Sequence, residues 1–486
     1  MSNHTNGVIN GSENETTLQC ETKTIITSYE THDLRFPTSL DQSGSDAMNP
    51  AGDYSAAYII LHTSTELKGH GFSFTIGRGN DLVCSAAALI AERLVGKGLE
   101  ELTQNMGKTW RYLVADSQLR WVGPEKGVIH LGLSVCVNAL WDLWARSLGK
   151  PVWQLVAEFT PEEFVRCIDF RYILDAIMPE DAIAILTNNN ETKQSRIQDV
   201  QDNRAVPAYS TQAGWLGFTD QRMIELMTGM INDGFDKFKL KVGGSLEDDK
   251  RRLKIARDIV GYDKMLMVDA NQVWSVPEAI DYMLQLVEFK PDFIEEPTSP
   301  DDILGHAAIR KALKRYGIGV ATGEHCQNRI MFKQFLQAGS IDVCQIDACR
   351  LGGVNEVMAV LLMAKKYRTL VNPTTYLLVL TSKPLLRFNI PVIPHSGGIG
   401  LNEYTQHLAI IDYVCVSAKK SLLENITSFN EAVTHPVKVK DGYFVTPWEA
   451  GYSVEYKPSF IEKYEYPQGS FWSSEQGLRI QSGPKL

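Results

Sequence analysis

Five successive apolar runs in the middle of the chain each carry charged residues at or near their C-terminal ends. The intervals between these ends each suit one strand, one helix and two loops, so the pattern predicts repeated parallel β/α units. In a parallel (β/α)8 barrel all C-terminal strand ends open onto one face, where such charges would converge. The residues concerned are Lys239, Lys241, Asp269, Glu295, Glu324 and Asp347.

Asp269, Glu295 and Glu324 are the carboxylates that three consecutive strands would deliver to one small region. Three like charges repel one another there unless a hard cation lies between them. Ligation by oxygen alone, without histidine or cysteine, favours Mg²⁺ over zinc. Each carboxylate taken singly could instead cap the next helix, but their shared position at strand ends favours a magnesium site.

Lys239 and Lys241 stand two positions apart in one predicted strand, so both side chains point to the same, inward side. Lys241 would have a second ammonium group and a cation beside it, which we expect to lower its pKa into the range of a general base. Lys239 would stay charged and bind a substrate carboxylate. Asn271, two residues after Asp269, either reaches the substrate from the same rim or caps the following helix.

His395 stands at the end of predicted strand seven, residues 391–395, and precedes Ser-Gly-Gly. It would face the lysines across the barrel, and Asp347 on the strand before could hydrogen-bond its far ring nitrogen. A lone histidine is more often structural, but this neighbouring aspartate favours a general acid. A base, a cation and an acid around one pocket could remove the α-proton of a carboxylate and expel a β-hydroxyl, although a racemase could use the same groups.

Several short motifs resemble the signature of the enolase superfamily, mandelate racemase branch. They are KLK at 239–241, VDAN at 268–271, IEEP at 294–297, TGE at 322–324, QID at 345–347 and PHSGG at 394–398. Further stretches resemble the L-fuconate dehydratases of that branch. These are RFPTSL at 35–40, SDAM at 45–48, DYSAAY at 53–58, LRWVGPEKG at 119–127 and WDLWA at 141–145. The resemblance therefore covers nearly the whole chain.

The resemblance implies a Mg²⁺-dependent acid-sugar dehydratase, a hydro-lyase that converts L-fuconate into 2-keto-3-deoxy-L-fuconate and water by α-proton abstraction and an enediolate intermediate. It implies Lys241, His395 and Asp347 as the catalytic residues, and a homo-oligomer. A racemase or a dehydratase of another acid sugar on the same site stays open. So does an inactive barrel that serves as a binding protein, although every catalytic position is filled.

The resemblance also implies substrate contacts. In the family, the long loop between the first two strands is a lid over the barrel mouth, whereas the pattern alone would also suit a plain surface loop. Glu424 is assigned by aligning the segment up to residue 436 without gaps, beyond a stretch at 418–423 that departs from the family. The implied contacts are Gly44, Ser45, Asp46, Tyr54, Lys239, Asn271, Ser396, Gly397 and Glu424.

The order of the patterns predicts an α/β protein, a (β/α)8-type barrel with an α+β N-terminal capping domain that the C-terminal segment completes. Residues 1–24 are polar and are expected to form a disordered tail. Residues 25–150 would form the cap, 151–205 a connector and 206–425 the barrel. Residues 426–486, including 442–447, would return to the cap.

Periodicity places particular elements within these units. The cap should contain strands at 25–29, 56–62 and 69–76 and helices at 80–98, 100–114 and 128–148. The connector should contain a helix at 180–186 and a polar linker at 187–203. The barrel should contain strand one at 208–211, strand seven at 391–395 and strand eight at 408–413.

An insert at 367–387 lengthens the interval between Asp347 and His395 and has no counterpart in the family. Because it joins a helix to a strand, we expect it on the barrel face away from the active site, where it can leave the chemistry intact. Its apolar middle, at 376–380, would need burial or a partner.

Composition excludes some functions. The 486 residues are 44 % hydrophobic, which is ordinary for a globular protein, and no apolar run is long enough to suggest a membrane protein. A net charge of −10 without any Lys/Arg-rich block argues against a nucleic-acid partner. Eight scattered cysteines without a CxxC pair, and no visible targeting signal, predict an intracellular protein, cytoplasmic or mitochondrial, whose partner is a small acid sugar.

Overall fold

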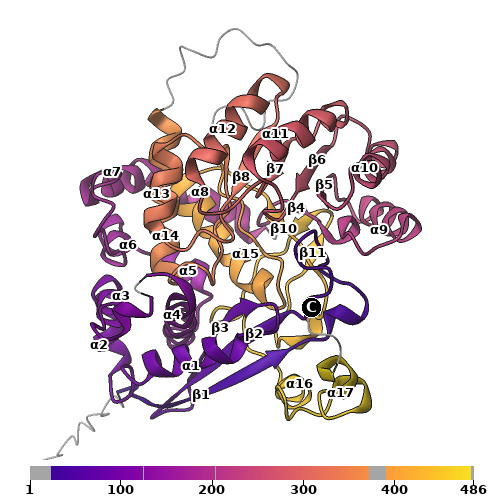
Figure 1. Cartoon of the computed structure of the whole chain (residues 1–486). Coiled ribbons are helices and arrows are strands. Elements are labelled where there is room, and N and C mark those ends of the chain that lie inside the picture. Colours follow the sequence, from indigo (N-terminus) through magenta and orange to yellow (C-terminus); the bar gives the residue numbers. More distant parts are fainter. Residues whose placement is uncertain (1–22, 124, 203, 371–389, 483–486) are drawn as a thin grey trace, which may run out of the picture.

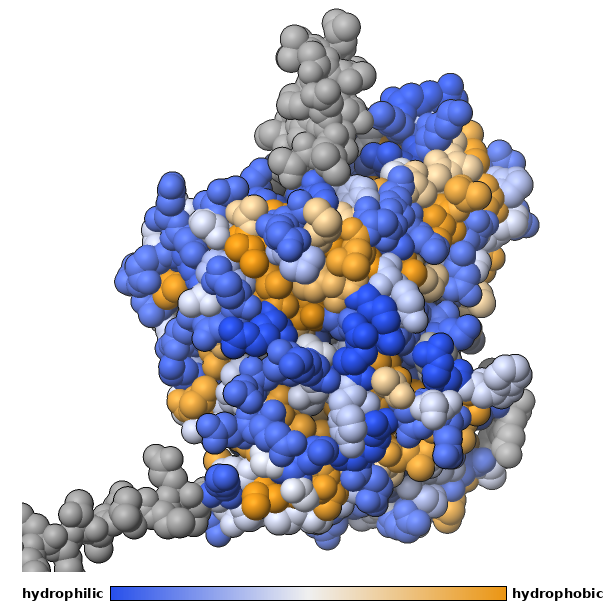
Figure 2. Space-filling model, turned by 90° about the vertical axis from the view of Figure 1, so that its left-hand side faces the viewer, coloured by the Kyte–Doolittle hydropathy of each residue, from blue (hydrophilic) through white to orange (hydrophobic). Residues whose placement is uncertain are grey.

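The computed structural model describes residues 23–123, 125–202, 204–370 and 390–482 (Figure 1). Most of the expected tail at 1–24 and of the expected insert at 367–387 lies outside these residues. A three-stranded sheet with its helices occupies the lower half of Figure 1, and the barrel strands with their helices occupy the upper half. On the side that Figure 2 shows, hydrophilic residues are interrupted by groups of hydrophobic ones. The domain limits given above stay a prediction.

The cap is built on the antiparallel sheet β1 (Ile26–Arg35), β2 (Ser55–Thr63) and β3 (Lys68–Thr75). Helix α4 (Gly127–Ser147) packs closely on β3 because Gly69 and Gly71 have no side chain. A Cβ at either glycine would lie within 2.5 Å of a carbonyl oxygen of α4. The other cap helices are α1 (Asn80–Ala91), α2 (Leu99–Thr103) and α3 (Met106–Val114), so the helices expected at 80–98 and 100–114 are respectively shorter and divided.

Helix α4 also has the length and composition of a membrane span, and it is the one such helix among the described residues. Buried residues make up 83 % of its most apolar window. Such burial is typical of the core helix of a folded domain, which the packing of α4 against α1 and β3 explains.

Six parallel strands begin the barrel, and helices follow each of them on the outside (Figure 1). The strands are β4 (Ala208–Tyr209), β5 (Lys237–Lys241), β6 (Met265–Asp269), β7 (Phe293–Glu295), β8 (Gly319–Thr322) and β9 (Val343–Cys344). The helices are α9 (Asp220–Asn232), α10 (Leu246–Val260), α11 (Val276–Gln285), α12 (Ile303–Leu313), α13 (Arg329–Gln337) and α14 (Val354–Leu370).

The barrel interior is filled by a compact cluster that includes Met267 and Phe293. These residues precede Asp269 and Glu295 by two positions, so the carboxylates point to the same inward side one layer higher. The α/β class and the barrel with its cap are confirmed.

The last two strand positions are less regular. Residues 391–395 lie beside β9, since Ile393 N donates to Cys344 O at 2.9 Å and His395 N donates to Ile346 O at 2.8 Å. The eighth position is taken by β10 (Leu423–Glu424), which pairs in parallel with β4. The strand expected at 408–413 is wrong, because these residues end α15 (Leu401–Ile411) and begin a π-helix, Asp412–Ser417. Every residue of α15 is buried, and its short apolar run at 408–411 cannot be told from a strand by periodicity alone.

Helices also fill the connector, as α5 (Val152–Ala157), α6 (Pro161–Arg166), α7 (Pro179–Asn190) and α8 (Lys193–Gln201). The polar linker expected at 187–203 is therefore wrong. Arg196 on α8 explains why this polar stretch is folded against the barrel domain: its buried guanidinium donates to Val414 O at 2.8 and 3.0 Å.

The C-terminal segment divides between the two domains. The hairpin β11 (Val439–Lys440) and β12 (Tyr443–Phe444) packs on the barrel, where Ala208 N donates to Gly442 O at 2.8 Å, so placing residues 442–447 with the cap is wrong. Residues further on do return to the cap, since Trp472 Nε1 donates to Arg35 O at 3.0 Å. Helix α16 (Pro458–Tyr464) contacts β1, and α17 (Glu475–Ser482) follows it (Figure 1).

Candidate functional site

The strand ends bring two ammonium groups against the buried carboxylates. Lys239 Nζ donates to Glu295 Oε2 at 2.6 Å and lies 3.4 Å from Asp269 Oδ2. Lys241 Nζ donates to Asp269 Oδ2 at 2.6 Å and to Asn271 Oδ1 at 2.8 Å. Asp269 and Glu295 are fully buried, so opposite charges alternate closely within this cluster.

The proposed general acid, His395, lies beside Asp347 as expected, across the barrel from the lysines. His395 Nδ1 and Asp347 Oδ2 are 2.6 Å apart, and His395 Nε2 lies 3.6 Å from Glu324 Oε2. Burial alone would lower the pKa of His395, but the carboxylates of Glu324 and Asp347 raise it to about 10. A doubly protonated imidazole that is held at Nδ1 can offer a proton from Nε2.

Glu295 has the features of a cation ligand. Burial, and the negative charges of Asp269 and Glu324, raise its pKa to about 8 despite the ammonium group of Lys239. Within the described part of the chain, Glu295 Oε1 is a buried oxygen without a hydrogen-bond partner. A hard cation would satisfy this oxygen and offset the repulsion, so the residues fit Mg²⁺.

The expectation of a lowered pKa for Lys241 assumes a bound cation, and the protein groups alone do not produce it. Burial and the charge of Lys239 do lower it, but Asp269, with help from Asp46 and Glu324, raises the pKa of Lys241 above its usual value. From the sequence alone, Lys239 and the carboxylates are all expected near Lys241. The distances in the folded chain decide which of these charges has the larger effect on the pKa of Lys241.

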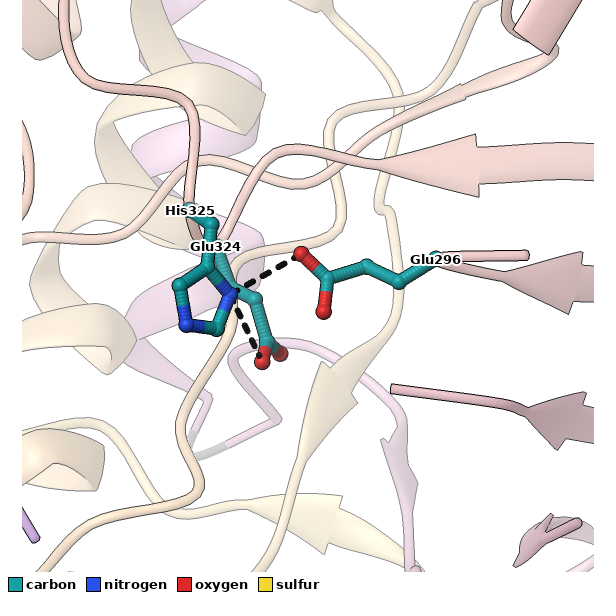
Figure 3. A group of neighbouring side chains, drawn as sticks. All are labelled: Glu296, Glu324 and His325. Atoms are coloured by element: carbon teal, nitrogen blue, oxygen red, sulfur yellow. Dashed lines mark hydrogen bonds and ion pairs between the residues drawn. The ribbon is translucent and has the colours of Figure 1, made fainter. Parts of the chain in front are cut away.

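A second group of possible ligands lies beside the first and was not expected from the sequence (Figure 3). One ligand atom from each of Glu296, Glu324 and His325 lies within 4.8 Å of the others. His325 Nδ1 is 3.0 Å from Glu296 Oε1 and 3.4 Å from Glu324 Oε1, and it contacts Gln272 Nε2 at 2.7 Å. Glu324 thus belongs to both groups.

Signals for this second group were present in the sequence. Glu296 is the second acid of the IEEP motif, and His325 directly follows Glu324. Asn271, Gln272 and Glu296 have φ values of 45°, 70° and 41°. Non-glycine residues in this strained region concentrate at functional sites, and this strain is visible only in the folded chain.

Glu424, assigned to the site by resemblance, does lie beside Lys239. Its Oε1 accepts from the Thr211 hydroxyl and lies 3.5 Å from Lys239 Nζ, and its Oε2 accepts from Ser396 N at 3.3 Å. Gly397 lies against the imidazole, since a Cβ there would come within 2.9 Å of His395 Nε2. The Ser396 hydroxyl instead contacts Thr405, away from the pocket charges.

The cap loop docks on the barrel rim. Ser45 O and Oγ accept from Leu216 N and Gly217 N at 3.2 and 2.9 Å. Asp46 Oδ1 accepts backbone N–H groups of its own loop at 2.7 Å, while its charge acts on Lys241.

Tyr54 links this loop to the site residues. Its ring lies edge-on to Phe74 at 5.1 Å, and Gly44 packs against its hydroxyl. Phe74 in turn lies 6.1 Å from the ring of His395. The loop residues therefore line the rim above the imidazole.

Comparison with known proteins gives one family. Residues 222–382 match the family described as "Enolase C-terminal domain-like". The chain is 61 % identical over 466 residues to the L-galactonate dehydratase of Hypocrea jecorina, covering 95 % of this chain and 99 % of the relative. It is 46 % identical over 451 residues to the human mitochondrial enolase superfamily member 1, covering 92 % of this chain and 97 % of that protein.

Solved structures agree with these sequence relatives. The crystal structure of the human mitochondrial enolase superfamily member 1 superposes with a TM-score of 0.87 at 44 % identity, covering 95 % of this chain and 99 % of that chain. An L-talarate dehydratase from Polaromonas sp. JS666, solved with Mg and L-glucarate, gives a TM-score of 0.65 at 19 % identity, covering 91 % and 98 %. At that identity the likeness concerns the fold alone.

Proposed function

Because the chain belongs to the enolase superfamily, we propose that it is a Mg²⁺-dependent dehydratase of acid sugars. The observation that carries this proposal is the placement of Lys241 and the His395–Asp347 pair around the strand-end carboxylates. The relative at 61 % identity, named for L-galactonate dehydration, supports it. A racemase on the same site is the second candidate, since a lysine and a histidine on opposite walls can exchange one proton.

The proposed substrate is an aldonate with the L-galacto configuration. The resemblance in the sequence implies L-fuconate, whereas the relative at 61 % identity is named for L-galactonate. The two acids share their configuration from C2 to C5 and differ only in a methyl or hydroxymethyl group at the far end. A pocket that hydrogen-bonds the terminal hydroxyl would reject L-fuconate by up to about 10⁴-fold, whereas an apolar pocket would separate the two by only about 10²-fold.

The ligands proposed for the cation are Asp269, Glu295 and Glu324. When bound there, Mg²⁺ would stabilise the negative charge that develops on the substrate carboxylate. Lys239, whose ammonium group already faces two of these residues, would bind the same carboxylate. The neighbouring Glu296–His325 pair is the alternative ligand set with Glu324.

The chain's own residues would move the protons. Lys241, held by Asn271 Oδ1, would take the proton from C2. His395 would give its Nε2 proton to the departing 3-hydroxyl while Asp347 keeps the ring in place through Nδ1. The enol left behind would then ketonise to a 2-keto-3-deoxy acid.

Release of keto acid tests this function. Purified protein with MgCl₂ should form a 2-keto-3-deoxy acid from L-galactonate or L-fuconate, detected as the semicarbazone, and a chelator should stop it. Formation of the C2 epimer, with exchange of the C2 hydrogen for solvent deuterium and without keto acid, would instead identify a racemase. No product and no exchange with any acid sugar would favour a binding protein.

Assembly and location also belong to this proposal. We propose a homo-oligomer, because Trp121 and Val122 are 94 % and 64 % exposed and large exposed apolar side chains are typical of interfaces. The relatives named as mitochondrial support an intracellular enzyme, in the cytoplasm or the mitochondrion.

A further inference from the structure

The loop between β9 and α14, residues 345–353, holds the partner of the proposed general acid. Asp347 Oδ2 contacts His395 Nδ1, while Asp347 Oδ1 accepts the backbone N–H groups of Cys349 and Arg350 at 2.7 and 2.6 Å. The path of the loop backbone therefore sets the rotamer of Asp347. That rotamer in turn sets the direction in which the imidazole of His395 points.

Two buried side chains of the cap donate hydrogen bonds to this loop from outside the barrel. Asn138 on α4 donates from Nδ2 to Ala348 O at 3.0 Å. Trp110 on α3 donates from Nε1 to Gly352 O at 2.7 Å. Both residues are almost completely buried, so water cannot replace either donor if it is removed.

The loop has little space to adjust around these two donors. A Cβ at Gly352 would lie 2.9 Å from Trp110 Nε1. A Cβ at Gly353, whose φ is +78°, would lie 2.5 Å from Val137. Close packing of this kind transmits a displacement of the cap helices directly to the loop.

We propose that Trp110 and Asn138 are positioning residues for the general acid of the reaction. They hold one carbonyl group within the turn that Asp347 begins, that of Ala348, and one just after it, that of Gly352. Through Asp347 they aim His395 at the leaving hydroxyl. The cap thus orients the general acid as well as covering the barrel. This inference rests on the proposed dehydratase, and it goes beyond that function by assigning two residues that touch no reacting atom.

Two variants remove one donor each while keeping most of the packing. Trp110→Phe removes the indole N–H, and Asn138→Leu replaces the amide with a branched side chain of similar size. Trp141→Phe is the matched control, because Trp141 on α4 is equally buried and donates to Asn355 Oδ1 at 2.8 Å, which lies on α14 and not on the loop.

Kinetics with two leaving groups separate positioning from general damage. With L-galactonate or L-fuconate, whichever turns over, kcat should fall about tenfold in Trp110→Phe and Asn138→Leu while KM changes less than about twofold. With the corresponding 3-deoxy-3-fluoro acid, whose fluoride leaves without a proton donor, both variants should match the unaltered protein. Trp141→Phe should match it on both substrates. Equal losses on the hydroxyl and fluoro acids, or no loss on either, would overturn the inference.

A spectroscopic measurement decides the question independently of turnover. In the unaltered protein the strongly hydrogen-bonded Nδ1 proton of His395 should give a downfield ¹H resonance, assigned by its absence in His395→Asn. It should move in Asn138→Leu and Trp110→Phe but stay in Trp141→Phe, and an unmoved resonance would overturn the inference. If Trp110→Phe fails to fold, Asn138→Leu carries the test. If the unaltered protein forms no keto acid, the proposed function fails while this resonance still decides the positioning.

Discussion

Glu356→Gln tests the buried charge network that joins the cap to the barrel. Glu356 Oε2 contacts His130 Nε2 at 2.7 Å and accepts Gly352 N at 2.8 Å, while its Oε1 accepts from Arg329 Nη1 at 2.9 Å. Burial raises the pKa of Glu356, but His130 and Arg329 outweigh it and lower the pKa to about 2. The carboxylate is thus held charged inside the protein.

The size of the effect follows from this pKa. A carboxyl group shifted from 4.5 to about 2 contributes roughly 3 kcal/mol of folding free energy at pH 7. Because the folded-state pKa is lowered, this stabilisation is complete above about pH 4.5 and is lost as the pH falls toward 2. At an unfolding entropy of about 2 cal/mol/K per residue, Glu356→Gln should lower the Tm by about 3 °C.

Differential scanning calorimetry and urea unfolding at pH 7 and pH 4 measure this loss. The difference from the unaltered protein should shrink at pH 4. Glu278→Gln, an exposed residue that caps α11, is the control and should leave the Tm almost unchanged. A loss below about 1 kcal/mol at pH 7, or one that grows toward pH 4, would refute the reasoning.

The remaining predictions concern the site. Mg²⁺ at 100 times its Kd should raise the free energy of unfolding by about 2.7 kcal/mol and the Tm with it. Glu295→Gln should abolish this rise, because it replaces one carboxylate oxygen with an amide NH₂ and removes the negative charge that would hold the cation. Glu296→Gln should largely keep that rise, and the reverse result would assign the cation to Glu296, Glu324 and His325. Lys241→Ala should reduce kcat by about 10³-fold or more while the far-UV circular dichroism stays unchanged, because the proposed base is lost. Lys237→Ala, at the opposite end of the same strand, should keep its activity, and equal losses in both variants would contradict the assignment of Lys241.

Much of the site was predictable because strand ends are local features. The alternation of Lys239 and Lys241 and the apolar runs before Asp269 and Glu295 fix which side chains point inward, and a parallel barrel brings their ends to one face. Strand eight was not predictable in this way. Residues 408–411 form a short apolar run at the end of the buried helix α15, and such a run does not distinguish a strand from a buried helix.

The sequence by itself determined which charged groups meet at the barrel mouth, because residue spacing along strands dictates facing and order. Only the tertiary structure decided how those charges divide: Asp269 outweighs Lys239 at Lys241, and His325 joins Glu296 and Glu324. It also decided that side chains of α3 and α4 in the cap form hydrogen bonds to the loop that carries Asp347. Coulomb energies and hydrogen bonds depend on distances of a few ångströms between residues far apart in the chain, and sequence spacing does not contain those distances.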